Sequence, residues 1–245
     1  MFLITRPAGK ADHLLESLDS YGIPYLYQPV ITTQMVQLKP KDIRWLEQAD
    51  SLIFVSISAV NTLEQQVTVK QLPGRLFAVG ATTGAALQRW TGRQVIIPED
   101  QRSEGLLALP ELNSVAEQQV VVVRGNGGRE LIKQTLVQRG ATVRYVQSYS
   151  RLPLPLDGAQ LKQQWQQQGV QCIVATSNEI LQRIFGLVPT EQHAWLAQQH
   201  WILVSPRARD SALALGIPLQ HIHLASSAND DALLEAVTQF KRNIL

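Results

Sequence analysis

The sequence has almost no cysteine and little charge of either sign. Its 245 residues include one cysteine, Cys172, which stands in the apolar run "VQCIVA". This count excludes a disulfide framework and a cluster of cysteine metal ligands, and we expect Cys172 to be a buried strand residue. Charged residues make up 17% and the formal net charge is +2, without a long basic run. Nucleic acid is therefore not an expected partner.

Long apolar segments are missing as well. No stretch approaches the roughly 20 apolar residues that a helix needs to cross a bilayer. The first residues, "MFLIT", resemble a strand and lack the basic start of a signal peptide. We therefore expect a cytoplasmic protein without a membrane partner. Apolar residues make up 45% of the chain, which suffices for one large core or for two domains of ordinary size.

Short apolar runs and helical patterns alternate along the whole chain. The runs that resemble buried strands are 2–5, 25–30, 51–56, 76–79, 94–97, 120–123, 142–146, 172–175, 201–204 and 221–225. Helical spacing separates them, as in 11–21, where Ala11, Leu14 and Leu18 recur on one face. Strands that are apolar on both faces, with helices between them, predict an α/β fold with parallel sheets covered on both sides.

The two halves of the sequence resemble each other. Arg6 precedes Gly22 by sixteen residues, and Arg124 precedes Gly140 by the same sixteen. "SLIFVSISAV" recurs as "QCIVATSNEI", and "LFAVGATTGAAL" recurs as "WILVSPRARDSAL". This repetition predicts two similar three-layer domains of the flavodoxin or Rossmann type, each with about five strands.

A non-helical segment follows the second predicted strand of each half. These segments are 31–40 and 148–156, and the second is rich in proline, which disfavours a helix. We interpret them as paired linkers, with a cleft between the two domains that they join.

Hydroxyl groups, arginines and glycines gather where the predicted strands end, which is where open parallel sheets bind ligands. The candidate binding residues are Arg6, Ser56, Ser58, Thr82, Thr83, Arg124, Gly125, Ser177, Ser205 and Arg207. Together with helix N-termini, such groups suit several anions spread over a wide cleft. A hydroxyl taken alone is more often simply a helix N-cap.

The stretch "VVVVRGNGGREL", residues 120–131, joins a strand to a helix through three glycines. A dinucleotide fingerprint would need a third glycine where Glu130 stands, and a Walker motif is absent. Two interpretations remain open: the loop holds an anion through backbone amides with Arg124 or Arg129, or its glycines only make the turn.

The sequence contains no familiar catalytic set. Its five histidines are scattered, and His221 and His223 have no cysteine or acidic neighbours, so we expect neither a metal nor a cofactor. Tyr149 remains as a candidate because it lies in the second linker, where a phenol could donate a proton to a departing oxygen. The alternative is a tyrosine packed against a domain edge.

Several short motifs, taken in order, resemble the uroporphyrinogen-III synthase family over essentially the whole chain. They are "TRP" (5–7), "FVSISAV" (54–60), "AVGATT" (78–83), "SEGLL" (103–107), "RGNGGRELI" (124–132), "YSR" (149–151), "ATSNEI" (175–180) and "VSPRA" (204–208). The resemblance implies two α/β domains, of residues 1–30 with 154–245 and of residues 39–146. Linkers at about 31–38 and 147–153 would join them.

The resemblance also implies a reaction. The substrate would be hydroxymethylbilane, a linear tetrapyrrole with eight carboxylates, which loses water, inverts its last pyrrole and closes into a ring. The anions of the loops would then be acetate and propionate side chains, and no cofactor would be needed. A monomer is implied, with at most transient contact with the enzyme that makes the substrate.

By position, Tyr149 resembles the proton-donating tyrosine of the family, and we expect Tyr149→Phe to slow turnover without abolishing it. Other positions resemble carboxylate-binding residues: Ser56, Thr82, Thr83, Arg124 and Ser177. The chain departs from the family where Thr-Ser-x-Asn-Ala becomes "VSISA" (55–59), so one polar contact is lost or replaced. Arg207 would stand in for a hydroxyl.

Two other classes of protein fit part of this pattern. A glycosyltransferase with two Rossmann domains would share the cleft, but it would be longer and would need an acidic ribose ligand that the sequence lacks. A non-catalytic module that binds tetrapyrroles or other anionic metabolites would have the same loops, and only turnover distinguishes it from an enzyme.

Overall fold

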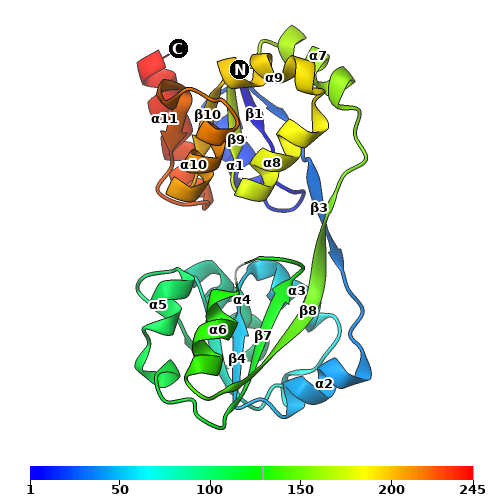
Figure 1. The fold of residues 1–245 in the computed structure, drawn as a ribbon, viewed down its shortest axis with the longest axis vertical. Coiled ribbons are helices and arrows are strands. Elements are labelled where there is room, and N and C mark those ends of the chain that lie inside the picture. Colours follow the sequence, from blue (N-terminus) through cyan, green and yellow to red (C-terminus); the bar gives the residue numbers. More distant parts are fainter. Residues whose placement is uncertain (129, 245) are drawn as a thin grey trace. The chain divides into compact units, whose positions relative to one another are not determined.

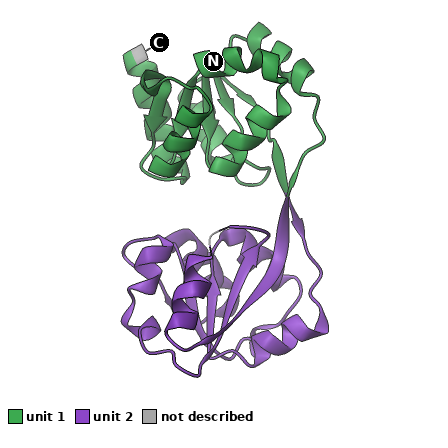
Figure 2. Ribbon diagram, viewed as in Figure 1, with its two compact units in different colours: residues 1–32, 152–245 green, residues 33–151 purple. Residues whose placement is uncertain are grey.

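The computed structural model describes residues 1–128 and 130–244. The chain divides into two compact units, residues 1–32 with 152–245 and residues 33–151, which Figure 2 distinguishes by colour. We refer to them as unit 1 and unit 2. The chain leaves unit 1 within strand β3 (Ile31–Met35) and returns to it within strand β8 (Thr142–Pro153).

Unit 1 is built on a five-stranded sheet in the order β11-β10-β9-β1-β2, in which every neighbouring pair is parallel. Its strands are β1 (Phe2–Ile4), β2 (Tyr25–Tyr27), β9 (Cys172–Ala175), β10 (His200–Leu203) and β11 (Ile222–Leu224). Its α-helices are α1 (Asp12–Ser20), α7 (Gly158–Gln167), α8 (Asn178–Leu187), α9 (His193–Gln198), α10 (Pro206–Ala214) and α11 (Asp230–Ile244). Short 3₁₀ helices occupy Thr190–Gln192 and Leu219–His221.

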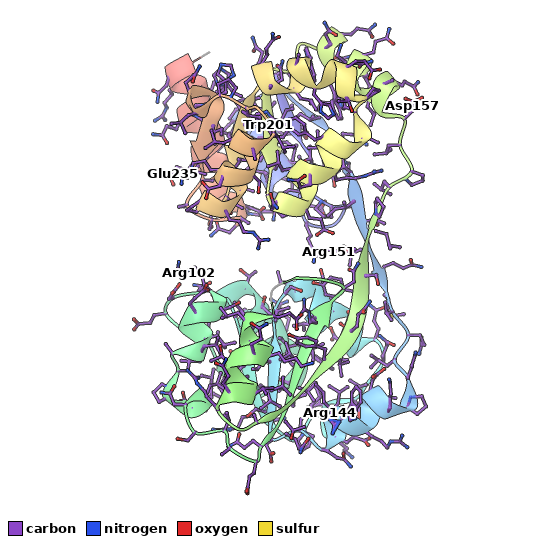
Figure 3. The ribbon with its side chains drawn as sticks, viewed as in Figure 1. Arg102, Arg144, Arg151, Asp157, Trp201 and Glu235 are labelled. Atoms are coloured by element: carbon purple, nitrogen blue, oxygen red, sulfur yellow. The ribbon has the colours of Figure 1, made fainter. Side chains whose placement is uncertain are left out.

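Two apolar cores lie on opposite faces of this sheet. Helices α1 and α11 form one core with Phe2, Ile4 and Val174. Helices α7 to α10 form the other, which contains the fully buried Trp165 and Trp201; Trp201 is labelled in Figure 3. Unit 1 therefore has the three layers that its strands, apolar on both faces, predict.

Unit 2 contains a six-stranded sheet in the order β3-β8-β7-β4-β5-β6. The strands not yet given are β4 (Ser51–Phe54), β5 (Arg75–Ala78), β6 (Val95–Ile96) and β7 (Gln119–Gly125). The α-helices are α2 (Pro40–Glu47), α3 (Ile57–Glu64), α4 (Ala81–Thr91), α5 (Ser103–Leu107) and α6 (Leu131–Gln138). Two 3₁₀ helices, Val69–Gln71 and Pro110–Leu112, complete the unit, whose helices flank the sheet in Figure 1.

The two sheets follow the same plan, which confirms the prediction of two similar domains. Strands β2-β1-β9-β10-β11 of unit 1 correspond in order to β8-β7-β4-β5-β6 of unit 2. The register agrees as well, because Ile4 pairs with Tyr27 and Val122 pairs with Tyr145. Ile4 and Val122 are each followed two positions later by an arginine, Arg6 and Arg124 respectively.

The expectation of about five strands per domain needs a correction in unit 2. Strand β3 adds a sixth strand beside β8, and β8 continues far beyond the predicted 142–146. Neither segment has the apolar run of a doubly covered strand, because both are half exposed. The predicted linker segments are thus largely β-strand, and the Val36 amide donates to the Ser148 carbonyl at 2.9 Å.

The plan of unit 2 leaves a crevice at the carboxyl edge of its sheet. Helix α3, which follows β4, packs on one face, whereas α6, which follows β7, packs on the other. Because β4 and β7 are neighbours, the two connections diverge where these strands end. Such a switch point is where open α/β sheets bind ligands. Within the described residues, no helix is long and apolar enough to span a bilayer.

Candidate functional site

A cavity of about 260 Å³ lies at this switch point of unit 2. Its polar lining comes from the segments at the carboxyl ends of β4 and β7, from β8 and from the first residue of α5. These residues include Ser56, Ser103, Arg124, Tyr149 and Arg151. Val55, Val122 and Ile132 supply apolar wall. The cavity therefore combines hydroxyl groups, guanidinium groups and apolar surface, a lining that suits an acidic side chain on an organic ring.

Tyr149 and Ser56 meet at the wall of this cavity. The Tyr149 hydroxyl lies 2.9 Å from Ser56 Oγ, and either oxygen can donate the proton of the hydrogen bond. Ser56 is held in place because it caps α3, with its Oγ accepting from the Ala59 amide at 3.3 Å. The Tyr149 side chain is buried within the apolar core on this face. The hydrogen bond from Ser56, which the N-terminus of α3 holds in place, thus fixes the Tyr149 hydroxyl at the cavity wall.

A β-bulge in β8 gives Tyr149 its direction. Arg124 pairs with Gln147, but the next residue of β7, Gly125, pairs with Tyr149, so Ser148 is the extra residue. The buried Ser148 hydroxyl accepts from Thr62 Oγ1 at 2.9 Å. Ser148 and Tyr149 consequently both face α3, which an unbroken strand would not allow. Bulges commonly redirect side chains beside active sites.

Gly125 is required by the close approach of the tyrosine ring. A Cβ atom built on Gly125 would stand 2.4 Å from Cε2 and 2.6 Å from Cζ of Tyr149. Any side chain at this position would displace the ring and with it the hydroxyl. The first glycine of the loop therefore serves the position of Tyr149.

Arg124 is the buried cation of the cavity. Its side chain is 10% exposed and donates to Glu130 Oε1 at 3.2 Å. The guanidinium also lies over the Tyr145 ring, 4.4 Å from its centroid. The Tyr145 hydroxyl donates to Glu130 Oε2 at 3.0 Å. Burial, followed by this bond to Glu130, raises the pKa of Tyr145 to about 12, so this phenol stays neutral in the physiological range.

The loop after β7 is built around the guanidinium and a hydrogen-bonded asparagine. Gly127 and Gly128 adopt left-handed φ values of 64° and 95°, and a Cβ on Gly128 would lie 2.7 Å from Arg124 Nη2. Asn126 accepts from the Arg151 amide at 2.6 Å and donates to the Arg151 carbonyl at 3.1 Å. Figure 3 labels Arg151 on β8. The predicted contribution of Arg129 lies outside the described residues.

Several predicted residues of unit 2 do not reach the cavity. Ser58 is buried in α3 and Thr83 in α4, and Thr82 is exposed in the first turn of α4. At the N-terminus of α4, the Ala81 amide donates to Gln101 Oε1 at 2.8 Å. The structure brings Ser56, Arg124, Gly125 and Tyr149 together and leaves these other hydroxyls outside the cavity lining.

The predicted residues of unit 1 occupy the carboxyl edge of its own sheet. Ser177 caps α8 and Ser205 caps α10, with each Oγ accepting a backbone amide at 3.2 and 3.1 Å, so the N-cap interpretation holds for both. Arg207 is exposed in the first turn of α10. Arg6 is bound to the Asp230 carboxylate and donates to the Ala228 carbonyl at 3.2 Å.

Sequence reasoning missed several residues of the cavity. Ser103, Tyr145 and Arg151 line it although they were not among the predicted binding residues. Arg151 stands two positions after Tyr149, and that spacing along a strand was the available signal. Glu130 was noted only for breaking a nucleotide fingerprint, and its contact with Arg124 depends on the fold of the loop.

Three of the five histidines cluster in unit 1, away from the cavity of unit 2. His200 Nδ1 lies 3.1 Å from His223 Nε2, and the His221 ring centroid is 4.7 Å from that of His200. Among the described residues, no group of three or more His, Cys, Asp or Glu side chains could hold a metal ion. Cys172 is fully buried, and burial raises its thiol pKa far above the ordinary value.

Sequence comparisons link the chain to one family. The model of uroporphyrinogen-III synthase HemD matches residues 12–235. Uroporphyrinogen-III synthase of Escherichia coli strain K12 is 36% identical, with 96% of this chain and 98% of the relative covered. The enzyme of that name from Salmonella typhimurium strain LT2 is 33% identical, with the same shares covered.

Solved structures agree on the fold. A mutant uroporphyrinogen III synthase from the extremely thermophilic bacterium Thermus thermophilus has a TM-score of 0.67 at 18% identity, covering 99% of this chain and 98% of that one. The corresponding protein from Helicobacter pylori 26695 has a TM-score of 0.63 at 15% identity, covering 98% of each chain. Because the family model matches most of the sequence, the chain belongs to the uroporphyrinogen-III synthase family.

Proposed function

We propose that this chain cyclises hydroxymethylbilane to uroporphyrinogen III, with loss of water and inversion of the terminal pyrrole. The observation that supports this most is the cavity of unit 2, where the Tyr149 hydroxyl lies 2.9 Å from Ser56 beside the buried Arg124. It combines a hydroxyl that can donate a proton to the departing oxygen with a cation that can bind a substrate carboxylate.

Proton donation by Tyr149 would start the reaction. The bond between the terminal carbon and its hydroxyl oxygen breaks, and that oxygen takes the Tyr149 proton and leaves as water. The pyrrole nitrogen supplies the electron pair, which gives an azafulvenium cation. A ring carbon of the last pyrrole then attacks this cation, and the last pyrrole is inverted. The ring carbon that forms the closing bond loses its proton, which can return to the Tyr149 phenolate. The overall change is loss of one water molecule.

Positioning would be the larger contribution of the protein. The hydroxymethylpyrrole ionises readily, so the enzyme must hold a flexible chain such that inverted closure is faster than direct closure. A volume of about 260 Å³ is small for four pyrroles, since drug-sized ligands fill roughly 300–1,000 Å³. We assign this cavity to one end of the substrate, with Arg124 binding a carboxylate.

Other residues remain candidates for the other carboxylates. In unit 2 they are Thr82, Thr83 and Ser58, whose backbone amides or hydroxyls stand at the same sheet edge as the cavity. In unit 1 they are Arg6, Ser177, Ser205 and Arg207, at the carboxyl edge of that sheet. Arg6 would have to exchange Asp230 for the substrate.

We also propose that the protein works as a cytoplasmic monomer, with at most transient contact with the enzyme that releases its substrate. The absence of a long apolar helix among the described residues is compatible with this. Analytical ultracentrifugation at micromolar concentration would give a mass near 27.3 kDa; a stable dimer would contradict the proposal.

The function is tested by the isomer that the protein makes. Purified protein receives freshly prepared hydroxymethylbilane, the products are oxidised, and uroporphyrins I and III are separated by chromatography, with heat-denatured protein as the control. We expect isomer III to dominate. Isomer I at the level of the control would contradict the proposal, and retained tight binding of uroporphyrin would then favour a tetrapyrrole-binding module.

A further inference from the structure

The bulge that turns Tyr149 toward α3 contains a buried polar side chain. Ser148 is fully buried, on the side of the sheet where Val146 and Tyr149 belong to an apolar core. An unbroken strand would place Ser148 and Tyr149 on opposite faces of the sheet, whereas the bulge places both on this one. A hydroxyl inside an apolar core is destabilising unless it is hydrogen-bonded. The partners of Ser148 therefore help to decide whether the bulge forms.

Helix α3 supplies these partners. The single proton of the Thr62 hydroxyl is shared between Ser148 Oγ at 2.9 Å and the Ser58 carbonyl, one turn earlier in the helix, at 2.6 Å. Ser148 Oγ in turn donates to the Ala59 carbonyl at 3.4 Å. Because the bond to Ser58 fixes the direction of the Thr62 hydroxyl, the position of Ser148 follows from the backbone of α3.

Two further contacts of this segment flank the pair of Thr62 and Ser148. At its start, Ser56 Oγ lies 2.9 Å from the Tyr149 hydroxyl. Just beyond the end of α3, the Gln66 side-chain amide donates to the Thr62 carbonyl at 3.0 Å and to the Val36 carbonyl at 3.1 Å. The Val36 amide donates to the carbonyl of the bulge residue at 2.9 Å. The bulge is thus held between the anchor of the tyrosine hydroxyl and the anchor of the neighbouring segment.

We infer that Thr62 is a positioning residue for the proton donor. Its hydroxyl binds Ser148, holds the bulge of β8 in place and thereby keeps the Tyr149 hydroxyl at the cavity wall. Thr62 is not among the residues that line the cavity, so it acts through Ser148 and not on a ligand. The inference rests on the proposed function for the role of Tyr149, but the effect of Thr62 on the position of the tyrosine ring requires only the fold.

Thr62→Val removes the hydroxyl and keeps the branched shape, and Ser148→Ala removes the same bond from the strand. We expect each to lower kcat by about five- to twentyfold, less than the roughly 10²-fold of a group misplaced by 1 Å, because the bond to Ser56 remains. KM should stay within about twofold, since the lost contact acts on the proton donor and not on binding. Thr62→Ser keeps the hydroxyl, and its kcat should be within about twofold of the wild type.

Thr91→Val is the matched control. Thr91 and Thr62 are both 9% exposed, and Thr91 also donates to a carbonyl four residues earlier in its helix, that of Leu87, at 2.8 Å. Its replacement should lower the urea midpoint about as much as Thr62→Val does and leave kcat unchanged. In a Tyr149→Phe background, Thr62→Val should lower kcat by less than about twofold. An equal loss in both backgrounds, or a loss no greater than that of Thr91→Val, would overturn the inference.

A second readout does not depend on turnover. In protein labelled with ¹³C-tyrosine, the NMR signal of Tyr149 is the one that disappears in Tyr149→Phe. We expect this signal to shift in Thr62→Val and in Ser148→Ala, but not in Thr62→Ser or Thr91→Val. A signal that keeps its position in all four variants would overturn the inference. If the wild type makes no isomer III while the signal shifts as expected, the proposed function fails and the positioning of Tyr149 by Thr62 stands.

Discussion

Replacing Gly125 by alanine should remove most of the activity while leaving the protein folded. The new Cβ would stand 2.4, 2.6 and 2.9 Å from three atoms of the Tyr149 ring. Carbon atoms in contact prefer roughly 3.5–4.0 Å, so the ring must move by about 1 Å. The hydroxyl moves with it and leaves the 2.9 Å bond to Ser56.

The magnitude follows from these two effects. Overpacking of a well-packed site costs about 1–3 kcal/mol, and a lost hydrogen bond costs about 1 kcal/mol. We therefore expect the free energy of unfolding to fall by about 2–4 kcal/mol. A catalytic group misplaced by about 1 Å can lower the rate by about 10²-fold.

The assay combines urea unfolding with the rate of isomer III formation. Gly186→Ala is the matched control, because a Cβ at that position of α8 meets nothing within 4 Å. Alanine there should stabilise the helix by about 0.5–1 kcal/mol and leave turnover unchanged. In a Tyr149→Phe background, Gly125→Ala should cost far less activity, since the hydroxyl is already gone. Full activity of Gly125→Ala alone would refute the reasoning.

Three further predictions concern the groups described above. Ser56→Ala should lower the free energy of unfolding by about 1 kcal/mol through the lost N-cap. It should also lower kcat, because the Tyr149 hydroxyl loses its partner. Urea unfolding measures the first effect and steady-state kinetics the second, and an unchanged kcat would show that Ser56 does not position Tyr149. Tyr145 should ionise near pH 12 rather than near its ordinary pKa of 10.0. The stability that it contributes is therefore complete below pH 10 and is lost as the pH rises toward 12. The difference between absorbance titrations of the wild type and of Tyr145→Phe at 295 nm measures this ionisation, and a midpoint near pH 10 would refute the prediction. Burial lowers the pKa of His200 and His223 from 6.5. The stability that the two neutral rings contribute is therefore complete above pH 6.5 and falls as the pH drops below that value. His223→Gln should flatten this fall in urea unfolding measured from pH 7.5 to 5, and a slope identical to that of the wild type would contradict the lowered pKa.

Much of the fold can be predicted because doubly covered parallel strands have a clear sequence pattern. Segments such as 51–56 and 172–175 are apolar at successive positions, and β4 and β9 lie within them. Strand β3 and the second half of β8 have no such pattern, because one side of each is exposed. Their pairing depends on contacts between segments far apart in the chain.

The candidate site could be predicted only in part for a similar reason. Ser56 and Arg124 stand where apolar runs in the sequence end, so the predicted ends of the strands were enough to identify them as candidates. The contact between Tyr149 and Ser56 depends on a bulge at Ser148 that no local pattern indicates. Thr83 lies outside the lining of this cavity because the first turn of α4 turns it inward, where it is buried.

Glu130 shows most clearly what spacing cannot predict. In the sequence it only interrupts a glycine pattern, and nothing marks it as a partner of Arg124. The left-handed Gly127 and Gly128 bend the loop so that the acid meets the guanidinium and Tyr145. Six residues separate the two charges along the chain, yet their contact is a property of the folded loop.

The most direct test of the account is the kcat of Tyr149→Phe with hydroxymethylbilane, measured beside Tyr21→Phe, which alters a tyrosine that is 64% exposed. We predict that Tyr149→Phe lowers kcat by about 10- to 100-fold, below the full range of about 10²–10⁴ for a general acid because the substrate ionises readily. KM should change little, and isomer III should remain the product. A kcat equal to that of the wild type and of Tyr21→Phe would contradict the assignment of Tyr149 as the proton donor.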